Sequence, residues 1–572
     1  MLRAVSWLVI IGVLVFGSMA HALAIKIEGV SRGLADDIRL HVGQPVEETR
    51  AAITAFANTI PENANKAMNA AGFYRARYVI GYTGTADAPA ITITVKPGEP
   101  VRISSLAISI DGDARLDAGY MPVIARIPVR RNGVFTHAEY ESTKNTLFDA
   151  AQNRGYFDFK FTTSTVKISR ENGTADITLA ATSGQRYRFG DVTFTTDYFT
   201  DELLTRYLPF KPGDFYESAN IATLTRDLQT TGFFESVRVL PIREQIANGI
   251  IPIRVAVTRR DKNQIGLGVG FATDTEWRTK VTWSKPTLNT AGHSFDSALE
   301  LSEVEQNISF QLRIPRKKNP LTNYWSLEYG LQNLEVDETQ SFLSTLNLQR
   351  VRQTSNDWRE SQFIRWERER STIGGVEDET DLVLPGIGWS KNKSTGLPFP
   401  TNGYSASVQF MYGSRFLLSD IDFYKSTLNY KWLKTLGKRN TFILALQYGA
   451  ISTNDFTRVP ASQRFFAGGD RSIRGFDYRS VSPRNPNGDA VGGRYLEVTS
   501  LEYNYRIRER WAVALFADAG RAFNRFDQDY SVGAGVGLRW YSPVGPFRID
   551  VASDVSEDDP GFTLHLSLGP DL

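Results

Sequence analysis

The chain has 572 residues, and its 65 Lys and Arg residues against 63 Asp and Glu leave a formal net charge of +2. A nearly balanced chain has no basic field that gathers nucleic acid, so we predict no nucleic-acid partner. The sequence contains no cysteine, which excludes disulfides, thiolate nucleophiles, thiolate zinc sites and iron–sulfur clusters. The five histidines lie far apart, and no nucleotide or nucleophile motif accompanies them. We therefore predict a protein that is not an enzyme and holds no cofactor or metal.

The N-terminus has the pattern of a secretory signal peptide. Arg3 precedes an uncharged apolar run over residues 4–16, and Ala22-Leu23-Ala24 fits the small-residue cleavage pattern. The run is short for a membrane span, and an uncleaved anchor is the alternative. We expect residues 1–24 to be the signal peptide and the mature chain to follow it.

A glycine followed by two aromatic residues occurs three times in the N-terminal part, at intervals of roughly 80 residues, at Gly72, Gly155 and Gly232. Each glycine follows a helical pattern and precedes two predicted strands, so it suits the cap that ends a helix. Another aligned glycine lies upstream in each unit, where we expect a first helix to begin, at Gly43, Gly133 and Gly213. The pattern predicts three small α+β units, each ordered strand, helix, helix, strand, strand, over residues 25–98, 99–183 and 184–260.

The composition changes near residue 260. Nine of the ten tryptophans lie beyond it, and Trp favours membrane–water interfaces. In residues 261–572 we identify sixteen candidate strands, several with strict alternation, as where Ile265, Leu267 and Val269 alternate with glycines. Such alternation is typical of a membrane barrel with an apolar exterior, but a soluble β-sandwich is the alternative. The strand number and the tryptophans favour a transmembrane β-barrel of sixteen antiparallel strands.

The longest connection, Ile451–Gly493, joins strands eleven and twelve, and strand parity places it on the outer side. Alternation in the following strands turns Glu502 inward, and it also turns Phe516, Asp518 and Gly520 toward the lumen. If the loop folds inward, the Arg474 guanidinium can meet the Asp518 and Glu502 carboxylates. Gly475 would then let the loop backbone pass close to the wall, beside Gly520.

The segment Ile473-Arg474-Gly475-Phe476 resembles the V/I-R-G-F/Y signature of the outer-membrane assembly superfamily that includes BamA and TamA. The segments 500–503, 516–520 and 545–550 resemble its strand motifs in the same order, and 400–403 resembles its P-x-x-G turn. The resemblance implies that residues 473–476 form a lumenal loop lock that braces the wall at Glu502, Phe516, Asp518 and Gly520. It also implies that the three N-terminal units are POTRA domains, whose edge strands pair with client or partner strands. Structural spacers are the alternative for these units.

Three POTRA units and the ending Gly569-Pro570 resemble the TamA branch of this superfamily, whose last strand leaves the barrel seam. Gly569 and Pro570 disfavour strand pairing, so we expect a weak lateral seam between the last strand and residues 263–271. The resemblance implies a factor that assembles or translocates outer-membrane proteins such as autotransporters. The implied partners are these unfolded clients, an inner-membrane-anchored TamB-like protein and the lipid bilayer. The alternatives are a two-partner secretion pore and a BamA-like general insertase.

We accordingly expect the barrel to lie in the outer membrane of a Gram-negative-type envelope. The N-terminal domains are then periplasmic, and the turns from even-numbered to odd-numbered strands face the same side. An enzyme with a periplasmic domain is a further alternative, but it would need a clustered nucleophile and base, which the scattered histidines do not supply.

Overall fold

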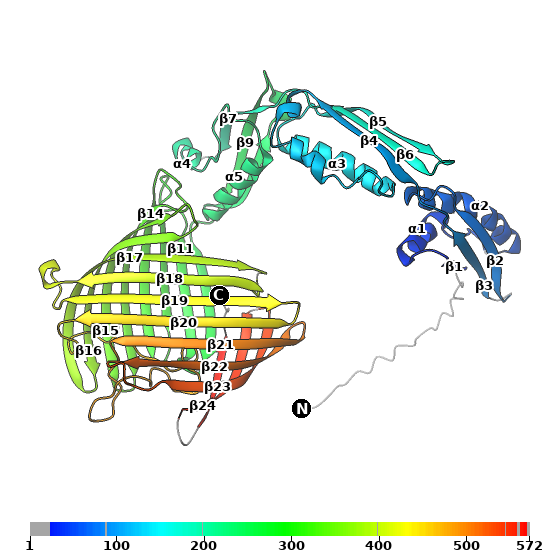
Figure 1. Cartoon of the computed structure of the whole chain (residues 1–572). Helices are drawn as coiled ribbons and strands as arrows, with labels where there is room; N and C mark the ends of the chain where they lie inside the picture. The colour runs from blue at the N-terminus through cyan, green and yellow to red at the C-terminus, as the bar shows by residue number, and fades with distance from the viewer. Residues whose placement is uncertain are drawn as a thin grey trace, which may run out of the picture. The chain divides into compact units, whose positions relative to one another are not determined.

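A computed structural model describes residues 23–47, 49–85, 88–196, 198–396, 398–543, 545–556 and 561–568 (Figure 1). Most of the predicted signal peptide and the predicted seam residues Gly569 and Pro570 lie outside the described residues, and Ala24 already begins the first strand. No α-helix within the described ranges has the length and apolar character needed to cross a membrane.

Three small three-stranded sheets follow one another in the N-terminal part, with strand orders β1-β3-β2, β4-β6-β5 and β7-β9-β8. In each sheet the third strand in sequence is central, which leaves the first and second strands as edges. The strands span β1 Ala24–Glu28, β2 Arg77–Thr85, β3 Ala88–Lys96, β4 Arg102–Asp111, β5 Lys160–Ser169, β6 Thr174–Thr182, β7 Arg188–Thr195, β8 Phe234–Pro241 and β9 Ile250–Arg259. The predicted three α+β units are confirmed.

Helices pack against these sheets and share their cores. In the first unit, Ile38 and Ile60 of the helices are fully buried with Ile91 and Ile93 of the central strand β3. Side chains alternate across a strand, so only one face of β3 is available for this core. The helices span α1 Arg32–Val42, α2 Arg50–Ala70, α3 His137–Asn153, α4 Asp201–Thr205 and α5 Ser218–Thr230. Short 3-10 helices span η1 Asp113–Leu116, η2 Met121–Arg126, η3 Arg243–Gln245 and η4 Arg415–Leu417.

The structure corrects the expected start of the first helix in each unit. Gly43 ends α1, with φ +71°, and Gly213 follows α4 with φ +94°. Gly133 lies between η2 and α3, so all three glycines separate the first helix from the second. The second unit also has η1 and η2 where we predicted an α-helix. At Gly43 the glycine serves because a left-handed residue ends a helix, and the sequence pattern alone did not distinguish this from a helix start.

Gly72, Gly155 and Gly232 follow α2, α3 and α5, with φ values of +91°, +82° and +74°. The first two also contact the next unit along the chain. The Gly72 carbonyl accepts a hydrogen bond from Val101 N at 2.9 Å, and the Gly155 carbonyl accepts one from Tyr187 N at 2.9 Å. A Cβ at Gly72 would lie 2.1 Å from the Phe135 carbonyl oxygen, so a side chain there would force the two units apart.

A charged cluster ties the second unit to the start of the third. Asp117 accepts hydrogen bonds from Arg154 Nε and NH2, both at 2.8 Å, and from the Tyr156 hydroxyl at 2.9 Å. Arg186 lies 3.6 Å from Asp117 and 3.1 Å from Glu217. Burial by itself raises the pKa of Asp117, but these hydrogen bonds outweigh it and lower that pKa to about 2.

The C-terminal part is a closed barrel of sixteen strands, β10 to β25, each paired with its neighbours in sequence order (Figure 1). The predicted sixteen-stranded barrel is therefore confirmed. Its strands are β10 Gln264–Ala272, β11 Glu276–Lys285, β12 Ser294–Leu301, β13 Glu305–Pro315, β14 Tyr324–Val336, β15 Thr339–Gln353, β16 Arg359–Ile373, β17 Val376–Thr395, β18 Asn402–Gly413, β19 Phe423–Leu436, β20 Asn440–Thr453, β21 Tyr495–Arg508, β22 Trp511–Phe523, β23 Ser531–Ser542, β24 Gly545–Asp554 and β25 Phe562–Leu568. We call the end where β10 begins the near end and the opposite end the far end.

Apolar side chains face the outside of the barrel and polar ones face its lumen. Ile265, Leu267 and Val269 expose 79%, 75% and 74% of their surface, as the alternation predicts. In β21 the neighbours Leu501 and Glu502 are 56% and 8% exposed. A water-filled or plugged lumen inside a lipid-facing wall produces this pattern, and a soluble sandwich would reverse it.

Candidate functional site

The connection between β20 and β21, residues 454–494, lies at the far end and folds against the inside of the barrel. Ile473 is fully buried in a hydrophobic cluster that also contains the loop residue Phe465 and the wall residues Val498 and Ala522. Phe476 packs against the same cluster. The apolar side chains of the loop therefore occupy part of the lumen and form an internal core against this side of the wall.

Arg474 lies on this loop and meets the wall at the predicted carboxylates. Its Nε and NH2 donate to Asp518 at 2.7 and 3.0 Å, a bidentate pair, and NH1 donates to Glu502 at 2.7 Å. The guanidinium also lies 3.5 Å from the centre of the Phe516 ring. All four side chains are at most 8% exposed. A bidentate pair with a stacked ring needs the planar, permanently charged group that only arginine provides.

The structure adds two strand residues to this cluster that the sequence analysis did not single out. Arg539 NH2 donates to Glu502 at 2.9 Å, and Arg539 also forms an ion pair with Asp550. Arg474 NH1 lies 3.3 Å from Asp550. Alternation along β23 places Arg539 on the lumenal face with the glycines of that strand, so the sequence pattern could have identified it. The cluster therefore joins β21, β22, β23 and β24 through the loop.

The nearest wall contacts of residues 474 and 475 of the loop are with β23 and β24. A Cβ at Gly520 would meet the β21 backbone, 2.4 Å from the Glu497 carbonyl oxygen. The wall glycine that receives the loop is Gly533 of β23, where a Cβ would lie 1.8 Å from the Arg474 carbonyl oxygen. Gly475 has φ +99° and lies beside β24, where a Cβ added to it would be 3.0 Å from the Ser553 carbonyl group. Strand stagger decides which wall glycine meets the loop, and parity carries no information on stagger.

A second contact ties the loop to both strands of the seam. Gly475 N donates to His565 Nε2 at 3.0 Å, so the proton of this imidazole is on Nδ1, which donates to Asp470 Oδ1 at 2.6 Å. Asp470 N in turn donates to Asp274 at 2.7 Å, and the Thr273 hydroxyl donates to Asp470 at 3.0 Å. His565 belongs to β25, whereas Thr273 and Asp274 form the turn after β10.

Burial raises the pKa of Asp274 to about 6, and the nearby Asp470 carboxylate contributes to the rise. Asp274, Asp470 and His565 offer three ligand atoms within 4.8 Å of one another, so they are the described residues best placed to hold a metal ion. Both imidazole nitrogens are already engaged in hydrogen bonds, however, and a metal would have to replace the Nδ1 proton. The cluster is accounted for as a hydrogen-bonded tie across the seam.

The seam between β10 and β25 has a single register pair, Ala272 with Ser567. By contrast, β10 pairs with β11 over its whole length, and β25 pairs with β24 over Phe562–Leu568. Residues 264–271 of β10 therefore have no strand partner on the β25 side in the described part of the chain. This open part of the seam lies at the near end, so the barrel is closed firmly only at the level of the loop tie.

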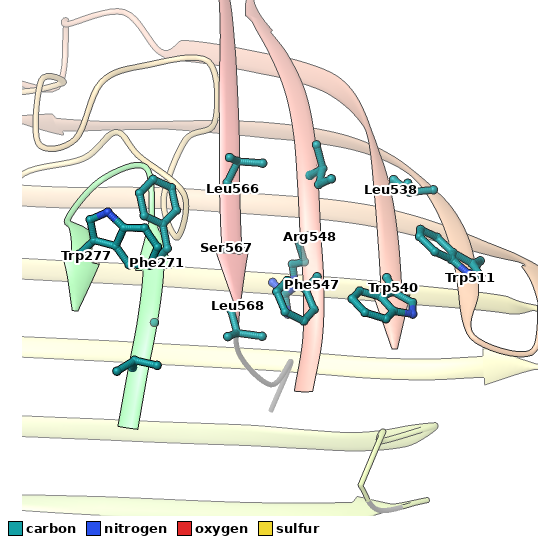
Figure 2. A pocket seen from close by; sticks show the side chains of 13 residues that line it. Phe271, Trp277, Trp511, Leu538, Trp540, Phe547, Arg548, Leu566, Ser567 and Leu568 are labelled. Carbon is teal, nitrogen blue, oxygen red and sulfur yellow. The ribbon is translucent and has the colours of Figure 1, made fainter. Parts of the chain in front are cut away.

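An apolar pocket of about 480 Å³ lies at this seam (Figure 2). Phe271 and Trp277 line it from the side of β10 and β11, and Leu566 and Leu568 line it from β25 (Figure 2). Aromatic side chains from β22 to β24 complete the lining, namely Trp511, Trp540 and Phe547. The pocket is thus part of the outer apolar surface, at the place where β10 and β25 are not paired.

A model of the Omp85 superfamily domain matches residues 260–571. The chain belongs to the Omp85 superfamily. A model of the first POTRA domain of TamA matches residues 24–97, and a POTRA model described as a surface antigen variable number repeat matches residues 107–184 and 187–260. The resemblance predicted from the sequence is confirmed, and the chain is an outer-membrane β-barrel protein with N-terminal POTRA domains. The near end of the barrel, which follows these domains directly, is its periplasmic end.

Curated relatives are similar over most of this chain. The outer membrane protein assembly factor BamA of Nitratidesulfovibrio vulgaris is 22% identical over 503 residues, which cover 83% of this chain and 62% of the relative. BamA of Neisseria meningitidis is 21% identical over 459 residues, 67% of this chain and 56% of the relative. The chain thus spans less than two thirds of the length of these relatives.

Among solved structures, BamA from Haemophilus ducreyi lacking POTRA domains 1–3 is similar, with a TM-score of 0.69 and 16% identity. The matched region covers 82% of this chain and 99% of that one. At this identity the likeness concerns the fold.

Proposed function

We propose that this chain is a TamA-type assembly and translocation factor that inserts or secretes β-barrel clients, such as autotransporters, through its lateral seam. The single observation that carries the proposal is the seam, where the described residues of β10 and β25 share one register pair, Ala272 with Ser567. An unpaired strand edge offers a row of backbone donors and acceptors to any incoming strand. The family and the TamA-type first POTRA domain support the same function.

The energy for such work comes from the client itself. Each client strand that pairs with residues 264–271 of β10 satisfies its backbone groups, which water no longer satisfies inside the bilayer. The outward side chains of β10 are already apolar, so a client strand with alternating residues extends the lipid-facing surface without a break. The factor lowers the barrier to insertion and needs no bond-breaking chemistry.

The POTRA sheets supply a second set of free edges. In the first domain, β2 is an edge strand, and its side chains Val79 and Tyr82 are 59% and 60% exposed. Strand addition to such an edge uses main-chain hydrogen bonds and tolerates many sequences. We infer that these edges receive unfolded clients and that the first domain binds an inner-membrane-anchored TamB-like partner.

The lumenal loop lock holds the wall beside the seam in register while the seam opens. We assign this role to Ile473, Arg474, Gly475 and Phe476, acting on Glu502, Phe516 and Asp518. The lock joins the strands on the C-terminal side of the seam to one another through the loop, so strain at the seam does not spread along the wall. Gly520 contributes to packing within the wall, where an added Cβ would meet the Glu497 carbonyl oxygen.

A disulfide across the seam tests the proposal, and no native thiol can form a competing disulfide because the sequence has no cysteine. Ala272→Cys with Ser567→Cys joins the paired residues of β10 and β25, and Ala517→Cys with Ala534→Cys joins paired residues of β22 and β23 as the control. We expect the oxidised seam variant to lose client insertion into liposomes and to recover it on reduction. Equal insertion by the oxidised seam variant and the control would contradict the lateral seam.

The similarity to BamA supports a second candidate, a general insertase. The two candidates differ in client range, because a general insertase should accelerate insertion of simple barrels and autotransporters alike. A two-partner secretion pore would conduct ions in single-channel recordings, whereas the loop that occupies part of this lumen favours a mostly closed channel. A pull-down through residues 24–97 tests the TamB-like partner.

A further inference from the structure

Five basic residues lie on the outer surface of the barrel near its periplasmic end, on strands β15 to β19. They are Arg350, Arg352, Lys391, Lys393 and Lys434. They face outward because they alternate with buried lumenal residues; Val351, for example, is 2% exposed and Leu433 is 1% exposed. These strands lie side by side on the wall opposite the seam, since β17 and β18 are the middle strands of the sixteen (Figure 1).

Aromatic side chains lie beside these cations in the strand register. Arg350 is opposite Trp325 of β14, and Lys393 is opposite Tyr404 of β18, which is opposite Trp432 of β19. Trp and Tyr collect at the level of the lipid headgroups, where their rings are buried and their polar atoms reach water. The cations are therefore at headgroup depth on the periplasmic side of the membrane.

The far end of the same strands has a different charge arrangement. There Arg368 pairs with Asp381 at 2.9 Å and Arg370 pairs with Glu379 at 3.0 Å, so each outward cation has a carboxylate on the next strand. At the periplasmic end, Arg352 has such a partner, Glu360, at 2.9 Å.

Arg350, Lys393 and Lys434 form no ion pair with any other described residue. An outward cation at the membrane surface without a protein carboxylate is available to an anion of the bilayer. In the described strands β15 to β19, the periplasmic end has outward cations without a protein carboxylate and the far end has paired ones. The periplasmic end is therefore where an anion of the bilayer can pair with them.

We propose that this face binds the phosphate groups of anionic phospholipids in the periplasmic leaflet. Each Lys or Arg near an anionic membrane surface contributes roughly a fivefold increase in binding. Arginine and lysine both suit phosphate oxygens, and the neighbouring aromatic rings pack against the glycerol and acyl region. The bound lipids hold the wall opposite the seam at a fixed depth, which leaves the seam side free to move.

The test uses the full chain reconstituted in nanodiscs of equal phosphatidylglycerol and phosphatidylcholine, with the lipids retained on the protein counted by native mass spectrometry. The test variant carries Lys393→Gln and Lys434→Gln. The control carries Arg368→Gln and Arg370→Gln, which remove the same charge from the far end. We expect the wild-type chain and the control to retain phosphatidylglycerol preferentially, and the test variant to lose at least fivefold of that preference.

Two results would overturn the proposal. One is an equal loss of preference in the control, which would show a general charge effect. The other is full competition by inorganic phosphate at the same concentration, which would show a site for free phosphate. Adding Arg350→Gln to the test variant should reduce the preference further. Trp fluorescence of each variant shows whether the barrel is folded, so a folding defect cannot be mistaken for lost lipid binding.

Discussion

Replacing Arg474 by alanine should destabilise the barrel more than any exposed ion-pair substitution. The change removes a bidentate pair with Asp518 and a 2.7 Å hydrogen bond to Glu502. Asp518 loses its ion-pair partner, whereas Glu502 and Asp550 keep their ion pairs with Arg539. Removing one partner of a buried ion pair costs about 3–5 kcal/mol, because the remaining charge keeps its desolvation penalty. Lost stacking on Phe516 adds about 1 kcal/mol. We therefore expect a loss of about 4 kcal/mol, a factor of about a thousand in the unfolding equilibrium.

Urea unfolding in detergent micelles, followed by tryptophan fluorescence, measures this loss. Arg525→Ala is the control, because the Arg525 side chain is 79% exposed and its pair with Asp527 should contribute only about 0–1 kcal/mol. Combining Arg474→Ala with Asp518→Asn should restore part of the loss, since one unpaired carboxylate is removed with the guanidinium. If Arg474→Ala costs no more than Arg525→Ala, the loop does not brace the wall.

Three further outcomes follow from single contacts. Gly533→Ala should destabilise the barrel by about 3 kcal/mol or more in the same urea assay, because its Cβ would overlap the loop backbone. The control Gly330→Ala should cost about 1 kcal/mol at most, because its Cβ would have no neighbour within 3.4 Å. The pKa of Asp274 is raised in the folded state from 3.8 to about 6, so between these pH values the folded protein holds a proton that the unfolded chain releases. The free energy of unfolding should therefore fall by at most about 2 kcal/mol as pH rises from 4 to above 6. Asp274→Asn should flatten this dependence when melting midpoints are measured across the pH range. Asp117→Ala should lower the free energy of unfolding of the second and third POTRA domains by about 1.5–3 kcal/mol and speed proteolysis at the joint between them. Unchanged cleavage would contradict a role for Asp117 in holding that joint.

The sequence predicted the barrel well because its signal is local. Alternation along a single strand is enough to assign Leu501 to lipid and Glu502 to the lumen, and the same parity gave the partners of Arg474. The arrangement across strands could not be predicted in the same way. Which inward residues meet depends on the stagger between neighbouring strands, so the sequence pattern did not identify Gly533 and His565 as contacts of the loop.

The POTRA domains show a related limit. Gly43 and Gly72 both have positive φ, and the sequence interpretation assigned only Gly72 to a helix end. A glycine between two helices ends one and precedes the other, so its position alone does not identify the element it caps. The hydrogen bond from Val101 N to Gly72 was also not predictable, because it depends on how consecutive domains pack.

The loop inside the barrel also bears on the barrier function of the bacterial envelope. A barrel of sixteen strands without such a plug would enclose an aqueous channel wide enough for small solutes. Because residues 454–494 pack against the inner wall through Ile473 and Arg474, they narrow this channel at the far end, which should limit the leakage of bulky antibiotics and detergents through the protein.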